Sequence, residues 1–280
     1  MDVTLAPERL FVLEERLTVD EIQQRAMDKR TQAFGGGLGA FLQRPKTDEV
    51  ALVAKQRRLE PFWHVRGKAT YVYERNRSYT VPAGSADVEA VTINGTRYDG
   101  APAPQRTFAV PVLEHCRATF TSESFTDGLT GAAVPEGSAL ITGVRSEVGD
   151  PQTLTANETL AEPPEHRASF VVRQVMSQIM KPVQADRVLE EAVELEVTDL
   201  YYRPWWAFEF TWQGKGKQGV VEIDAITGNT RQGKPLTGQI RSMFNRDVLF
   251  DVGADTVGLF VPGGSIAVKI AKAAIDSNKK

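Results

Sequence analysis

Three carboxylates, Glu209, Glu222 and Asp224, occupy alternate positions in a hairpin predicted between Tyr201 and Ala225. Alternate residues of a β-strand point to the same side, so the three share one face. Such a set could bind a divalent ion or work as acid–base pairs. A solvated polar face is the simpler interpretation, and both interpretations stay open at this point.

A basic set occupies the corresponding face of an earlier aromatic strand. His64, Arg66 and Lys68 follow Pro61 at alternate positions. An acidic face and a basic face on related sheets could meet, within one molecule or between subunits, and charge complementarity would then set their orientation. We expect any binding at these residues, at the three carboxylates and at the outward-facing Trp205.

The remaining motifs predict no further chemistry. The glycines from Gly35 to Gly39 follow a predicted helix and lack the Gly-Lys-Ser/Thr sequence of a phosphate loop, so they are interpreted as a connector. His115 and Cys116 are adjacent and would point to opposite faces of a strand, so neither could activate the other. We predict no catalytic residue, no metal site and no cofactor.

Two strands that begin at a proline must position the candidate residues. After Pro204 the even positions are apolar, and after Pro61 the odd positions are apolar. This period of two predicts β-strands with one buried face. The residues expected to face the core are Trp206, Phe208, Phe210 and Trp212 in the later strand, and Trp63, Val65, Ala69, Tyr71 and Tyr73 in the earlier one.

A helix is predicted ahead of each of these strands. Thr18 and Glu21 form a capping-box pattern, which indicates a helix from Val19 to Ala33. The segment from Glu165 to Met180 places its apolar residues on one helical face. The repeated order suggests a tandem duplication.

The predicted fold is therefore α+β, with two related helix-plus-antiparallel-sheet units and a helical C-terminal tail. The tail prediction depends on helical spacing between Ile240 and Leu249 and on a helix capped by Ser265. The predicted domains are a first α+β unit at 1–112, a connecting region with extra strands at 113–164, and a second unit with the tail at 165–280.

One local resemblance accompanies these patterns. The segment Val220 to Thr230, VVEIDAITGNT, resembles the strand–turn segment of PepSY-type domains, in which an Asp-Ala-x-Thr-Gly run closes a hairpin. It covers about a dozen residues. The resemblance implies a small helix-and-sheet module that binds protein, usually outside the cytoplasm, and it implies no catalytic residue.

Composition limits the classes of function. The chain has 33 basic and 36 acidic residues, which argues against nonspecific nucleic-acid binding. One cysteine and an N-terminus without a signal-peptide pattern favour a reducing cytoplasm. The uncharged stretches are too short to span a bilayer as helices, although those at Phe34–Leu42 and Val257–Val268 could touch a membrane surface or pack against protein.

We therefore expect a non-enzymatic binding or scaffold module in a protein assembly of bacterial type, acting through a protein partner or self-association. The alternatives are a metal-dependent hydrolase that uses Glu209, Glu222 and Asp224, and a peripheral membrane protein attached weakly through its C-terminal tail.

Overall fold

The computed structural model describes residues 1–34, 45–102, 106–234, 236, 249–250 and 269–272. Most of these residues lie in strands, which form a mixed 10-stranded sheet and a separate two-stranded sheet. The first sheet is built of β1 (Asp2–Leu5), β2 (Glu8–Leu13), β3 (Val50–Pro82), β6 (Thr107–Asp127), β7 (Arg145–Glu147), β8 (Leu160–Ala161), β9 (Arg187–Trp212), β10 (Lys217–Asp224), β11 (Thr230–Gly233) and β12 (Lys269–Lys272); the second contains β4 (Ala90–Ile93) and β5 (Thr96–Asp99).

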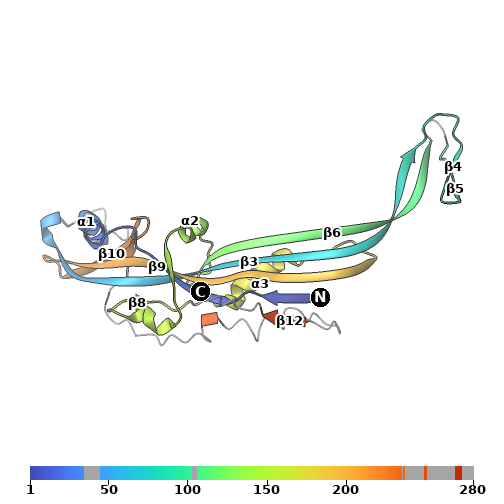
Figure 1. The fold of residues 1–280 in the computed structure, drawn as a ribbon. Helices are drawn as coiled ribbons and strands as arrows, with labels where there is room; N and C mark the ends of the chain where they lie inside the picture. The colour runs from blue at the N-terminus through green and yellow to red at the C-terminus, as the bar shows by residue number, and fades with distance from the viewer. Residues whose placement is uncertain (35–44, 103–105, 235, 237–248, 251–268, 273–280) are drawn as a thin grey trace.

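Two very long strands form the centre of the large sheet (Figure 1). β3 has 33 residues and β9 has 26, and they pair antiparallel from Val50↔Trp212 to Glu74↔Arg187. The outer side of β3 pairs with β8 and β6. The outer side of β9 pairs with β10, β2 and β1. β9 therefore has neighbours on both sides over most of its length, and β3 has them at 58–59 and from Phe62 to Glu74.

The prediction of a balanced α+β fold with two units is wrong. The two proline-aromatic strands are β3 and β9, and they are direct neighbours in one sheet, with Pro61 opposite Tyr202 and Pro204 opposite Leu59. The backbone N–H and C=O groups of a buried strand need partners on both edges. The two strands provide these partners for each other along one edge, so the aromatic segments build one continuous sheet.

The predicted helical tail is also corrected. Lys269–Lys272 lies inside the helix expected after Ser265, yet it forms strand β12, which pairs parallel with β1 from Asp2↔Lys269 to Leu5↔Lys272. Backbone pairing with the outer edge of β1 outweighs the helical spacing of this short segment. The glycine-rich segments at 35–39 and 262–264 lie outside the described residues.

The described part of the chain has three α-helices beside the sheet: α1 (Val19–Lys29), α2 (Gly137–Ile141) and α3 (Ala168–Ile179). The capping box of α1 is confirmed, because Glu21 N bonds the Thr18 hydroxyl and the Glu21 carboxylate accepts from Thr18 N. α3 falls within the helix predicted at Glu165–Met180. Short 3₁₀ turns occur at Arg30–Phe34, Thr47–Glu49 and Pro151–Thr155.

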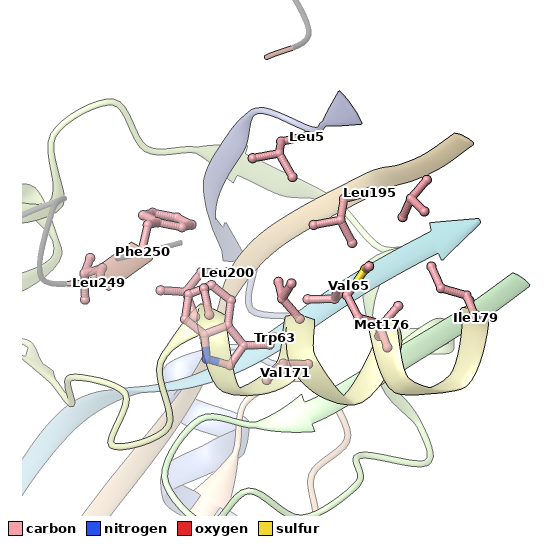
Figure 2. Packing of buried hydrophobic residues seen from close by; sticks show 14 of the residues in the cluster. Leu5, Trp63, Val65, Val171, Met176, Ile179, Leu195, Leu200, Leu249 and Phe250 are labelled. Carbon is pink, nitrogen blue, oxygen red and sulfur yellow. The ribbon is translucent and has the colours of Figure 1, made fainter. Parts of the chain in front are cut away.

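Among the described residues, the buried apolar side chains form three clusters. In the largest, Val171, Met176 and Ile179 of α3 lie beside Trp63 and Val65 of β3 (Figure 2). The second cluster joins α1 to β9 and β10, and its buried members include Ile22, Ala26, Phe208, Phe210 and Ile223. The third cluster lies around α2, and its buried members include Phe62, Leu140 and Tyr201. The predicted inward face of the aromatic strands is thus largely confirmed, with Trp206 only half-buried.

Candidate functional site

The polar face predicted to carry function is buried. Trp205, Glu209, Glu222 and Asp224 retain 7%, 5%, 3% and 0% of their accessible surface. The pairing register explains their common side, because Trp205 lies opposite Asp224 and Ala207 lies opposite Glu222. A solvated face is therefore excluded for these residues, and their charges need partners inside the protein.

Asp224 closes the turn after β10 and neutralises a largely buried arginine, Arg203. Its carboxylate accepts hydrogen bonds from Ile226 N at 2.8 Å and from the Thr227 hydroxyl, and it forms an ion pair with Arg203. Arg203 also donates to Glu136 at 2.8 Å. Gly228 completes the turn at a φ of +75°, a conformation that glycine adopts without strain. The Asp-Ala-x-Thr-Gly run thus forms a turn that anchors an arginine.

Glu222 holds two further arginines. Arg231 of β11 donates to it at 2.7 Å, and Arg58 of β3 forms an ion pair with its other oxygen. Arg231 also pairs with Glu60. The guanidinium of Arg231 lies 4.0 Å from the centre of the Trp205 ring, a distance at which a cation and an aromatic face attract each other. We call Arg58, Arg203, Arg231, Glu60, Glu222 and Asp224 the charged layer.

A pocket of about 410 Å³ adjoins the charged layer. Burial raises the pKa of Glu60 beside it, and the Arg231 guanidinium opposes that shift. The pocket is lined by five carboxylates and three cationic side chains: Glu60, Asp127, Glu162, Glu165, Glu222, Arg58, Arg231 and Lys234. Within the described part of the chain, no three His, Cys, Asp or Glu side chains are grouped to hold a metal ion.

The three predicted carboxylates do not form one site. Glu222 and Asp224 each have their own arginine partners, and only Glu222 lines the pocket. Glu209 is buried separately, and its Oε1 has no hydrogen-bond partner among the described residues. The arrangement neutralises charge within the fold and leaves no pair of these carboxylates arranged around a shared reactant.

The predicted basic residues pair with carboxylates other than these three. His64 is buried, stacks on Phe125 at 4.5 Å and contacts Glu123 at 2.7 Å. Arg66 and Lys68 pair with β9, at 2.8 Å to Glu196 and 3.9 Å to Glu194. These contacts join β3 to its two neighbouring strands.

A surface that the sequence interpretation missed is the outer edge of β6. This 21-residue strand pairs with β3 along its whole length, and Figure 1 shows it at the margin of the sheet. Its other edge has a strand-like contact only at Thr126, which bridges Ala133, as far as the described residues extend. The signal was present as apolar residues at the even positions from Phe108 to Phe120, interrupted at Glu114, and only Arg117–Phe120 was predicted as a strand.

Beyond Glu74 and Arg187 the pairing with β9 ends, and the β3–β6 hairpin continues with hydrogen bonds from Asn76 to Asp186 and from Arg77 to Gln184 at its base. We call this projecting part the arm, consisting of 75–82 and 107–114 with β4 and β5 at its tip (Figure 1). Large apolar side chains of the arm are exposed, including Tyr79 at 51% and Leu113 at 49%.

Comparisons with known proteins found no matching family model, no similar curated protein and no similar solved structure. The described helices include none with the length and apolar character required to cross a membrane.

Proposed function

We propose that this protein is a non-enzymatic scaffold of a bacterial-type assembly, whose copies associate through the outer edge of β6. The observation that carries the proposal is the length of that edge. An unpaired row of backbone N–H and C=O groups is a template for another strand, and strand addition is a common mode of protein recognition. The exposed apolar side chains of the adjoining arm add surface that a neighbouring molecule would cover.

The contacts of the charged layer favour a scaffold over a metal-dependent hydrolase. A general base or metal ligand must have a carboxylate available to substrate or metal. Glu222 and Asp224 are instead engaged by arginines, and the arrangement resembles the internal ion pairs of a structural core. We place the protein in the cytoplasm, as its single cysteine suggests.

Sedimentation velocity over a wide range of protein concentration tests the proposal. We expect the wild type to associate as concentration rises. The double variant Thr119→Lys/Thr121→Lys, at exposed positions of β6, should remain monomeric because charges on an edge strand oppose strand addition. Thr230→Lys, at an exposed position of β11 and away from both β6 and the arm, is the matched control and should associate like wild type. A wild type that stays monomeric throughout would refute self-association.

A further inference from the structure

We infer that two copies join their β6 strands antiparallel about a two-fold axis at Phe120. This inference rests on the proposed self-association and specifies its register. A two-fold axis perpendicular to the sheet places residues with the same side-chain direction opposite each other. The axis therefore passes between the two copies of one residue of β6, which lie opposite each other. Because Ala133 already bridges Thr126, the pairing extends from Cys116 to Ser124.

The charged residues of β6 indicate which residue lies at the two-fold axis. On the exposed side of the strand, Arg117 and Glu123 lie three residues before and three residues after Phe120. An axis at Phe120 therefore places Arg117 of each copy opposite Glu123 of the other, forming two cross-strand ion pairs per dimer. An axis at Arg117 or at Glu123 would instead place like charges together.

The other side chains suit the same register. Thr119 lies opposite Thr121 of the second copy, and both are exposed. Threonine pairs are favourable across antiparallel strands. Glu123 already contacts His64, yet its side chain remains 45% exposed and can accept a second donor. On the opposite side of the strand, Cys116 lies opposite Ser124 of the second copy.

Charge reversal tests the register through the dimer dissociation constant, measured by sedimentation equilibrium. Arg117→Glu and Glu123→Arg should each raise this constant roughly tenfold, because two attractive pairs become two repulsive pairs. The double variant Arg117→Glu/Glu123→Arg restores the pairs and should return close to the wild-type value.

Disulfide trapping tests the register of the two β6 strands independently, because it leaves Arg117 and Glu123 unchanged. Ser124→Cys should form a covalent dimer with the native Cys116 under mild oxidation, since directly opposed residues have the Cα separation that a disulfide needs. Ser122→Cys, two residues away on the same side of β6, is the matched control and should react far more slowly.

The outcomes separate this inference from the proposed function. A wild type that dimerises, with unchanged affinity in both single reversals and equal trapping of the two cysteine variants, would overturn the register and leave self-association standing. A monomeric wild type would overturn both. Selective trapping of Ser124→Cys with rescue in the double charge variant would support the register.

Discussion

Asp224 combines three structural tasks in one side chain. It ends β10, holds the following turn through Ile226 and Thr227, and neutralises the buried end of Arg203. Because the carboxylate is fully buried, each of its oxygens needs a partner inside the fold. The residue that looked like a candidate ligand on sequence grounds therefore holds the sheet together.

We predict that replacing Asp224 destabilises the protein. Asp224→Ala leaves the mostly buried Arg203 without its main counter-ion, and we expect a loss of about 3–5 kcal/mol in the free energy of unfolding, measured by urea denaturation. The control is Asp99→Ala, which removes the exposed Arg97–Asp99 pair and should cost less than about 1 kcal/mol. Equal losses in the two variants would contradict a structural role for the charged layer.

At the scale of elements, the 3₁₀ turn after α1 contacts β10 closely because Gly219 has no side chain. A Cβ at Gly219 would lie 2.5 Å from the backbone oxygen of Ala33, well inside the normal contact distance. The same region buries Ile22 and Ala26 against Phe208 and Phe210. The packing of α1 against the sheet thus depends on the absence of a side chain at Gly219.

We predict that Gly219→Ala destabilises the protein by about 1–3 kcal/mol, since backbone atoms must move to admit the methyl group. Thermal or urea denaturation measures this change. Gly84→Ala is the control, because no atom of the described residues lies within 4 Å of its new Cβ, and its stability should stay within about 0.5 kcal/mol of wild type. A neutral Gly219→Ala would show that the turn does not pack tightly there.

At the scale of the whole molecule, support of the β3–β6 hairpin changes along its length. From Phe62 to Glu74, β3 has β6 on one side and β9 on the other, whereas 75–82 and 107–114 pair as strands only with each other within the described part of the chain. Two-stranded ribbons are marginal in water. The molecule therefore combines a firmly held sheet with a projecting element that depends on its own few contacts or on a neighbour.

Hydrogen exchange measured by mass spectrometry tests this division. We expect amides at 75–82 and 107–114 to exchange roughly tenfold or more faster than those at 62–70 of the same strand, because local opening of the arm disrupts fewer contacts. The segment 62–70 is the internal control. Equal protection of the two segments at low protein concentration would contradict a weakly supported arm.

The sequence by itself determined the local features. The period of two identified the aromatic strands, Thr18 and Glu21 identified the start of α1, and the apolar face at 165–180 identified α3. These features depend on neighbours a few residues apart, so patterns of spacing and capping are sufficient to predict them.

Only the tertiary structure decided which strands pair and which polar groups are buried. Glu222 is buried with Arg58, which is 164 residues away, and the two long strands join in one sheet through contacts far apart in the chain. An alternating pattern predicts that a segment is a strand, but it does not predict which other strand pairs with it. The tertiary pairing therefore made the predicted functional face internal and left the outer edge of β6 exposed.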